Sequence, residues 1–369
     1  MEEIKPFAWI VLTASFFSLF FNSSLNYSVG VIHIALLDTY VDEDIQTISW
    51  LGSLFSSMFA ISGFMGTILI NMFNVRVCVM VSGVVTLIGF SLSSIVTDMR
   101  YLFITYSLIG GTGQAICYTG SMVTLGYYFK HKASMASGIA LCGCGLCTFV
   151  FPPISQLFVD RYGLNGAFLL LGALGFQSTV CGALMRPTEF EIVAKRRLLC
   201  IMLKSMQFCL FLISSVAFNM GQSIIYLFLP DYFRHLGSSS MEAAFILSIA
   251  GVTGVVARVL LGFLTQLVNS AIVYGGTFGI MGIITYFVKY MTTLPSKLFF
   301  TSMFGFYTGA CWVLHYTILV ETVGIGKLSD AMGIGMVFCG IGYFTGPPLA
   351  VFMMRLVILR FTIHLALTF

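Results

Sequence analysis

The chain is dominated by long stretches that contain no charged residue. Ten of them lack Asp, Glu, Lys and Arg altogether, and an eleventh contains only Arg258. Each has at least about the 20 apolar residues that an α-helix needs to cross the hydrocarbon core of a bilayer. The sequence therefore predicts eleven membrane-spanning helices. The stretches are residues 6–37, 45–75, 77–97, 101–129, 133–159, 162–185, 205–230, 243–267, 268–288, 298–320 and 331–354.

Composition supports this interpretation and argues against a soluble domain. Hydrophobic residues make up 58% of the chain and charged residues 9%, whereas about a quarter of the residues are charged in a soluble domain. A membrane β-barrel would show short alternating segments instead of long continuous runs. The predicted fold class is therefore an all-α integral membrane protein. We expect no cofactor, no metal, no nucleic-acid partner and no enzymatic activity.

Charge divides the chain into two parts. Six predicted spans precede residue 186 and five follow residue 204, and the segment between them is rich in charge. Two helical bundles around a central substrate site are typical of carriers. We predict an N-terminal six-helix bundle over 1–185, a cytosolic connector over 186–204 and a C-terminal bundle over 205–369. The residues after Phe352 are too few and too basic for a full span, so we interpret them as a short or truncated twelfth helix.

The distribution of Lys and Arg predicts the orientation, because positive residues gather in the cytosolic loops of membrane proteins. We therefore expect a multi-pass protein with a cytosolic N-terminus. The segments that would then lie inside hold Lys5, Arg76, Lys130, Lys132, Arg186, Lys195, Arg196, Arg197, Lys204 and Lys327. Those that would lie outside hold Arg100, Arg161, Arg234, Lys289 and Lys297.

Two glycine clusters lie inside apolar runs, at 110–113 and 143–147. A phosphate-binding loop would need a preceding strand and a following helix in water. In lipid, small residues instead allow helix backbones to approach one another closely. We therefore interpret both clusters as helix-packing sites.

Arg258 is the most informative single residue, because it stands deep within an apolar run. At 1.5 Å per residue it lies roughly 20 Å from the outer end of its helix. A central arginine costs at least about 2.5 kcal/mol on insertion scales, so it should face water or a partner. Its guanidinium can bind a carboxylate with two hydrogen bonds, which indicates an anionic group on a substrate. The alternative partners are a buried acid from another helix or backbone carbonyls at a helix end.

Two further groups are candidates for a substrate pocket. The first span carries many amides and hydroxyls, among them Asn26 and Tyr27. Such groups are costly against lipid, which indicates that this helix lines a cavity. His315 shares a helix face with Trp312 three residues earlier. That histidine could relay protons or bind a substrate, or it could be a packed core residue.

Several segments resemble the monocarboxylate transporter family of the major facilitator superfamily, in the order of that family. They cover nearly the whole chain. They are YYFKHKASMASGIALCGCGLCTFVFPP (127–153), DRYGLNGAFLLLGAL (160–174), CGALMRP (181–187), AAFILSIAGVTGVVARVLLGFL (243–264), LVETVGIGKLSDAMG (319–333) and GPPLA (346–350).

The resemblance implies twelve helices in two bundles, alternating access, a plasma-membrane location and an accessory single-span membrane glycoprotein. It also implies that Arg258 binds the substrate carboxylate. Two residues of the proton-coupled members are absent, because Gly254 stands in place of an aspartate and Tyr27 in place of a lysine. The chain therefore looks like a divergent, facilitative carrier of a small carboxylate-bearing solute, with Arg258, Tyr27, Asn26 and His315 at the site. A proton-coupled symporter and a non-transporting binding protein are the alternatives.

Overall fold

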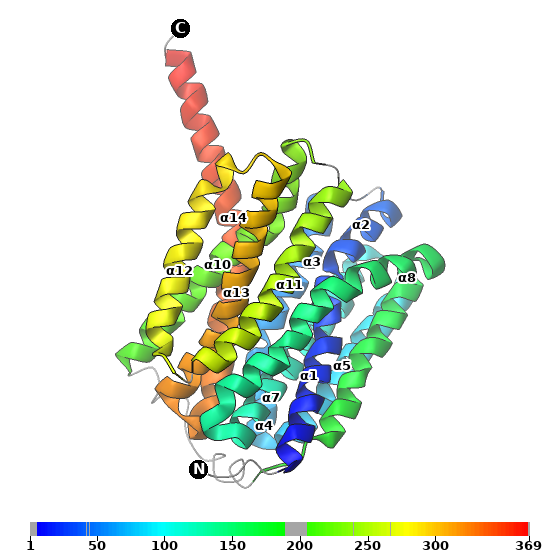
Figure 1. Cartoon of the computed structure of the whole chain (residues 1–369). Helices are drawn as coiled ribbons and strands as arrows, with labels where there is room; N and C mark the ends of the chain where they lie inside the picture. The colour runs from blue at the N-terminus through cyan, green and yellow to red at the C-terminus, as the bar shows by residue number, and fades with distance from the viewer. Residues whose placement is uncertain are drawn as a thin grey trace.

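A computed structural model of the chain describes residues 6–188, apart from 42 and 44, and residues 205–367, apart from 239 and 266. Its described elements are helices, and most of them run roughly parallel to one long axis (Figure 1). Apolar side chains remain exposed on the outside of the bundle. On the outer helix α12 (Ser270–Tyr286), for example, Ile272 is 72% exposed. An all-α protein with an apolar outer surface is what the charge-free stretches predict.

The first half contains two bent rods and one long helix that turns back. In α1 (Pro6–Tyr27) and α2 (Val29–Thr39) the bend lies at Ser28, and in α3 (Ile45–Ile61) and α4 (Gly63–Met72) it lies at Ser62. The next rods are α5 (Val75–Ile95) and a combined rod of α6 (Met99–Leu102), η1 (Phe103–Gly110) and α7 (Gly111–Phe129). The long helix α8 (Ala133–Leu184) follows the short turn η2 (Lys130–Lys132).

Helix α8 covers two of the expected spans. It is interrupted at Gly163, whose φ of 70° and ψ of −179° are non-helical. Glycine adopts positive φ readily because it has no Cβ, so the chain can reverse its direction at this point. Pro152 and Pro153 lie within the same helix shortly before the reversal.

The second half consists of α10 (Met206–His235), α11 (Ser240–Leu264), α12, α13 (Leu294–Val323) and α14 (Leu328–Leu367). Short turns, η4 (Phe287–Tyr290) and η5 (Ile325–Lys327), precede the last two helices. Each of the eleven predicted stretches is thus mostly helical over its described residues. Seven segments of the described chain are long and apolar enough by themselves to cross a membrane. The connector 189–204 lies outside the described residues, so the domain boundaries at 185 and 204 stay a prediction.

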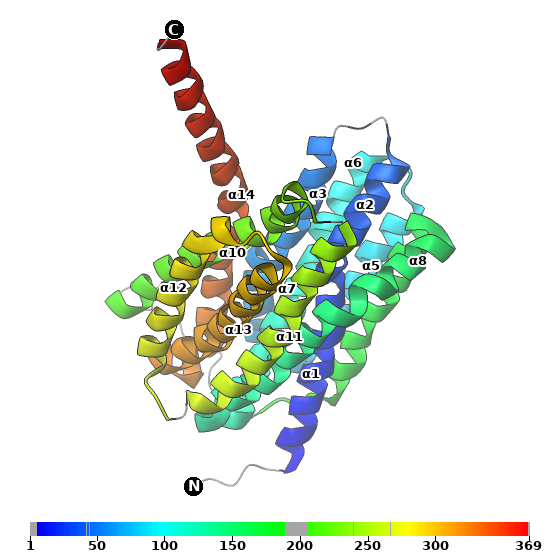
Figure 2. The same cartoon turned by 45° about the horizontal axis from the view of Figure 1, so that its top comes forward.

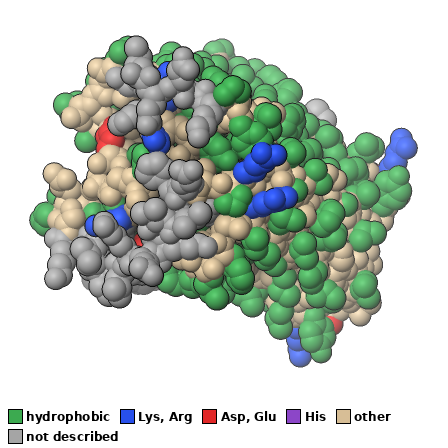
Figure 3. Space-filling model, turned by 90° about the horizontal axis from the view of Figure 1, so that it is seen from below, with side chains coloured by type: hydrophobic (Ala, Val, Ile, Leu, Met, Phe, Trp, Pro, Cys, Tyr) green, Lys and Arg blue, Asp and Glu red, His purple; other side chains and the backbone are tan. Residues whose placement is uncertain are grey.

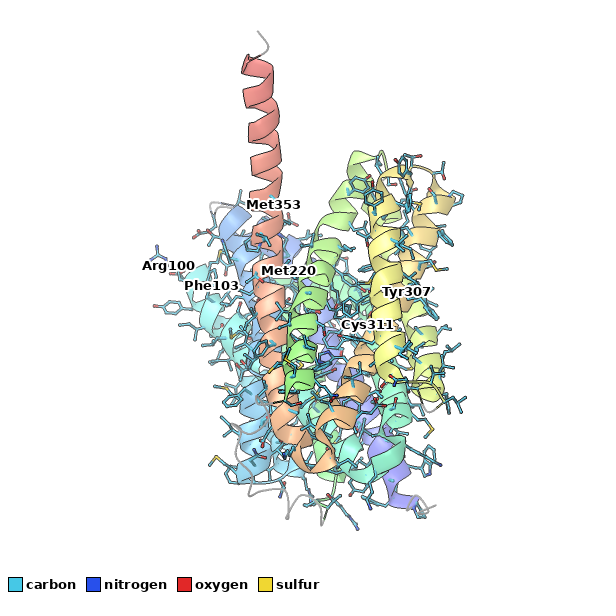
Figure 4. All side chains as sticks on the ribbon, turned by 90° about the vertical axis from the view of Figure 1, so that its left-hand side faces the viewer. Arg100, Phe103, Met220, Tyr307, Cys311 and Met353 are labelled. Atoms are coloured by element: carbon cyan, nitrogen blue, oxygen red, sulfur yellow. The ribbon has the colours of Figure 1, made fainter. Side chains whose placement is uncertain are left out.

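The C-terminal residues differ from the expected arrangement. Residues 353–367 continue α14 instead of starting a separate helix. The continued helix leaves the bundle at the end opposite the N-terminus, near Met353 (Figures 2 and 4). After Pro348 the sequence contains neither Gly nor Pro, so no residue there favours ending a helix.

Glycine positions decide how closely the helices pack, as the sequence predicts for both clusters. A Cβ added at Gly113 would lie 2.8 Å from the backbone nitrogen of Thr86 on α5, and one at Gly143 would lie 2.6 Å from the carbonyl oxygen of Phe16 on α1. Both approaches are closer than a side chain allows. The helix-packing interpretation of 110–113 and 143–147 is confirmed.

The two halves contact each other along two seams. Helices α1 and α5 pack on α8 within the first half, and α11 packs on α13 within the second. Between the halves, α8 packs on α11, and α14 packs on α3 and α4. The α8–α11 seam contains Arg258, so the pairing of the halves positions the most informative residue of the sequence.

Helices α11 and α13 should depend on glycine for their contact, because a Cβ at Gly309 would lie 2.5 Å from the carbonyl oxygen of Gly254. We expect Gly309→Ala to destabilise the protein by about 1–3 kcal/mol, the usual cost of overpacking. The melting temperature in detergent would measure this. Gly276→Ala on α12 is the matched control, because nothing lies within 4 Å of its added Cβ. Equal melting temperatures for the two variants would contradict this account of the contact between α11 and α13.

Candidate functional site

Arg258 lies on α11 at the seam with α8 and is only 8% exposed. Its Nη1 donates a hydrogen bond to the backbone carbonyl of Leu141, at 3.1 Å. Its Nε has no hydrogen-bond partner among the described residues. The guanidinium carries five N–H donors, so much of its hydrogen-bonding capacity is unused within the described chain.

Two glycines of α8 make room for this arginine. A Cβ at Gly138 would lie 2.6 Å from the carbonyl oxygen of Arg258, so this glycine lets the two backbones approach. A Cβ at Gly145 would lie 2.6 Å from Nη1 of Arg258. The guanidinium therefore occupies space that an alanine at 145 would remove.

The electrostatic neighbours of Arg258 are phenols and thiols. The strongest of them are Tyr27, Cys144, Tyr226 and Cys142. In the part of the chain that the structure describes, no carboxylate forms an ion pair with it. Glu321 accepts a hydrogen bond from Ser270 instead, and Asp330 accepts one from Asn71. The positive charge thus lacks a matching negative charge within the described protein.

Tyr27 ends α1 beside this arginine, and its phenol lies near Thr148 on α8. The bend of the first rod follows at once, where the hydroxyl of Ser28 lies 2.5 Å from that of Ser155. Asn26 is half-buried next to Tyr27, and no contact between Asn26 and Arg258 is seen. The structure thus brings Tyr27, but not Asn26, to the arginine.

Part of the polar patch on α1 serves packing within the first half. Asn22 donates to the carbonyl of Gln114 at 3.1 Å, and Gln114 donates back to the carbonyl of Asn22 at 2.7 Å. Ser23 donates to the thiol of Cys144. These groups therefore form hydrogen bonds with one another between neighbouring helices. The sequence alone cannot distinguish polar residues of this kind from residues that line a cavity.

His315 lies inside the second half, between α10, α13 and α14. Its Nδ1 is 3.4 Å from the hydroxyl of Ser215, its Nε2 is 3.8 Å from the thiol of Cys339, and its ring centroid is 4.6 Å from that of Phe211. It is linked to Trp312 by a ring contact of 6.0 Å. No contact with Arg258 is seen, so a role for His315 at the site stays a prediction.

The structure adds three tyrosines that sequence reasoning did not identify. Tyr118 and Tyr226 are electrostatic neighbours of Arg258. Tyr343 is an electrostatic neighbour of Tyr27, Tyr118 and Tyr226. Nothing in the local sequence distinguishes them from the other tyrosines of the apolar runs. Their position depends on which face each helix turns inward.

Polar contacts join the halves at the end where α1 begins, the end seen in Figure 3. Asn71 at the end of α4 donates to the carboxylate of Asp330 at the start of α14, at 2.6 Å. One turn before Asn71 on α4, the hydroxyl of Thr67 donates to the carbonyl of Ser329 at 2.8 Å. Tyr316 on α13 donates to the carbonyl of Met122 on α7 at 2.9 Å. This end of the molecule is closed in the structure.

A surface cavity and a pair of cysteines are two further features of the described chain. A cavity of about 330 Å³ lies on the outside between α1 and the last part of α8, where Gln177 and Thr13 are among the lining residues. Cys144 and Cys147 are spaced as a CxxC pair, but both thiols are free. The described residues contain no cluster of His, Cys, Asp and Glu large enough to hold a metal.

Comparison with known proteins identifies the relatives of this arrangement. The model of the Major Facilitator Superfamily matches residues 11–347. The chain is 28% identical over 350 residues to monocarboxylate transporter 13 of Bos taurus, covering 93% of this chain and 82% of the relative. It is 27% identical over 382 residues to monocarboxylate transporter 12 of Homo sapiens, covering 93% and 74%.

Solved structures agree on the fold. The proton:xylose symporter XylE superimposes with a TM-score of 0.77 at 12% identity, covering 94% of this chain and 90% of that protein. The E. coli fucose:proton symporter superimposes with a TM-score of 0.72 at 12% identity, covering 93% and 92%. The two-bundle fold expected from the sequence resemblance is confirmed.

The contact between Asn71 and Asp330 can be tested by cross-linking. We expect cysteines placed at both positions to form an oxidative cross-link between the halves, because the native side chains are within hydrogen-bond distance. Cleavage at a protease site inserted in 189–204 would leave the halves joined on a non-reducing gel. The control pairs Phe73→Cys, which is half-exposed, with Asp330→Cys. Equal cross-linking of both pairs would contradict the specific contact.

Proposed function

The chain belongs to the Major Facilitator Superfamily as a multi-pass membrane transporter related to monocarboxylate transporters, and on this premise we propose that it carries a small carboxylate-bearing solute by facilitated diffusion. The observation that carries the proposal is the buried charge of Arg258. Its guanidinium has one backbone carbonyl as hydrogen-bond acceptor and no acidic partner among the described residues. A buried, unpaired charge is strongly unfavourable, and a substrate carboxylate would relieve that cost with two hydrogen bonds.

The packing of α11 supports facilitated diffusion over proton coupling. Gly254 lies against α13. The proton-coupled members of the family that the sequence resembles have an aspartate at this position. A Cβ there would be 3.2 Å from the carbonyl oxygen of Gly305, and Gly309 approaches from the next turn. A side chain at 254 would press on the backbone of α13, which would have to give way by a few tenths of an ångström. Together with the uncharged Tyr27 beside Arg258, this leaves no proton-accepting acid next to the arginine in the described chain.

In this proposal, some of the site residues contact or adjoin the carboxylate, and His315 acts through a neighbouring residue. Arg258 binds the carboxylate and Tyr27 lies directly beside it. Asn26, adjacent in the chain, contributes an amide to the same end of α1. His315 would act indirectly, because its ring packs against that of Trp312 and holds it in position. The solute would reach Arg258 when the halves separate at one end and leave when they separate at the other.

Orientation and location complete the proposal. The end closed by Asn71 and Asp330 would face the cytosol, because the basic residues of the sequence gather on that side. The protein would then reside in the plasma membrane with a cytosolic N-terminus. An accessory single-span glycoprotein would pack on the apolar outer surface, where the cavity between α1 and α8 offers a contact for a helix.

Uptake into proteoliposomes tests this function. We expect lactate, pyruvate, creatine or an aromatic amino acid to equilibrate without accumulating when a proton gradient is imposed. Arg258→Ala should reduce uptake at least about tenfold, since a lost charged hydrogen-bond pair is worth several kcal/mol. Gly145→Ala should reduce it too, by displacing the guanidinium, whereas Gly275→Ala has open space around its added Cβ and should not.

Gradient-driven accumulation would favour a proton-coupled symporter instead. Absence of uptake for the whole panel would favour a membrane protein that binds a ligand or partner without transporting it. Uptake that survives Arg258→Ala would remove this residue from the site.

Restoring the missing acid offers an independent test of the packing argument. We expect Gly254→Asp to lower the melting temperature and to leave proton-driven accumulation absent, because the new side chain would meet the backbone of α13. Thermal melting and uptake in a pH gradient would be measured on the same preparation. A variant that is stable and accumulates substrate would show that position 254 can accept a coupling acid.

A further inference from the structure

Tyrosines from four different helices form one cluster, and three of them are electrostatic neighbours of Arg258. Tyr27 comes from α1, Tyr118 from α7, Tyr226 from α10 and Tyr343 from α14. Tyr343 interacts electrostatically with the other three tyrosines, and Tyr27, Tyr118 and Tyr226 interact with Arg258. Two of the four belong to each half, so this tyrosine cluster (Tyr27, Tyr118, Tyr226 and Tyr343) forms only when the halves come together.

Further aromatic rings extend the tyrosine cluster. Tyr118 lies edge-on to Phe59, with ring centroids 5.5 Å apart, and to Trp312 across the two halves at 6.2 Å. Tyr226 lies edge-on to Phe304 at 5.5 Å. Of the four tyrosines only Tyr118 is fully buried. The other three are half-buried although they stand within or at the end of long apolar helices, so each of them stays partly accessible.

The surroundings of the tyrosine cluster contain one positive charge and no matching negative charge within the described chain. Arg258 is the one charged group among the main electrostatic neighbours of the four tyrosines in the described chain, and the rest are tyrosine hydroxyls and cysteine thiols such as Cys144 and Cys339. A substrate with a single carboxylate would make the occupied site neutral. An added ammonium group, or a second carboxylate, would leave one charge unmatched in a poorly solvated site, which is costly.

We propose that Tyr118, Tyr226 and Tyr343, together with Tyr27, are specificity-determining residues that select aromatic monocarboxylates, with an uncharged ring among the tyrosines and the carboxylate on Arg258. This inference rests on the proposed function. Aromatic rings favour edge-to-face or offset-stacked contacts with other rings, beyond the gain from burying apolar area. The faces of tyrosine rings also attract cations, but the fixed positive charge of Arg258 opposes a cation at this position.

A set of four related acids separates these possibilities. Lactate and 3-phenyllactate share a head group and differ by the ring. Phenylalanine adds an ammonium group to the same skeleton, and phenylsuccinate carries a second carboxylate. Uptake of each would be measured in proteoliposomes, with protein-free liposomes as background. We expect 3-phenyllactate to be taken up with a Michaelis constant at least about tenfold lower than each of the other three acids shows.

Tyrosine variants test the assignment to these residues. Tyr226→Leu and Tyr343→Leu remove the ring but keep an apolar side chain, and should lower the preference for 3-phenyllactate over lactate at least about threefold. Tyr226→Phe and Tyr343→Phe keep the ring and should retain the preference. Tyr101→Leu is the matched control, because Tyr101 is 59% exposed on the outside of the bundle.

The outcomes distinguish this inference from the function on which it rests. Uptake that depends on Arg258 but shows equal Michaelis constants for lactate and 3-phenyllactate would overturn the inference alone. The same holds for a preference for phenylalanine or phenylsuccinate, or for a ring preference that both Leu variants leave unchanged. Uptake of none of the four acids would overturn the proposed function and the inference together.

Discussion

The arrangement of this protein depends on one positive charge held inside an apolar bundle. Arg258 cannot reach water easily from its position on α11, and the described chain offers it a backbone carbonyl but no carboxylate. A protein that only needed to be stable would gain by replacing such a group with an apolar one. The proposed function rests on this charge, because the carboxylate of a ligand would supply the missing anion. The groups that surround it in the described chain are phenols and thiols.

The glycines around this charge explain how it can be accommodated. Gly138 and Gly145 bring α8 close to α11 on one side, and Gly254 brings α13 close on the other. In the proposed function, the same close approach leaves little room beside Gly254 for an acid that would exchange protons with the substrate. In the proposed function, substrate binding and the absence of proton coupling would both follow from this packing, in which Arg258 is retained and Gly254 stands in place of an acid.

The sequence predicted the site unevenly, for reasons of geometry. Arg258 and Tyr27 were identified because charge and polarity in an apolar run are visible without any structure. Asn26 and His315 share that polarity, but neither is seen in contact with Arg258, and His315 lies among Ser215, Cys339 and Phe211. Tyr118, Tyr226 and Tyr343 were missed because the apolar runs contain many other tyrosines. Only the rotation of each helix decides which tyrosines face Arg258.

By itself the sequence predicted which stretches are helical and apolar, and that Arg258 lies deep within one of them. These predictions follow from the spacing of charged residues and from the requirement that backbone groups be hydrogen-bonded in lipid. The tertiary structure decided which polar residues meet, that residues 353–367 extend α14, and that a neighbouring backbone fills the space beside Gly254. Those outcomes depend on contacts between helices that are far apart in the chain, and a linear pattern carries no information about which faces will touch.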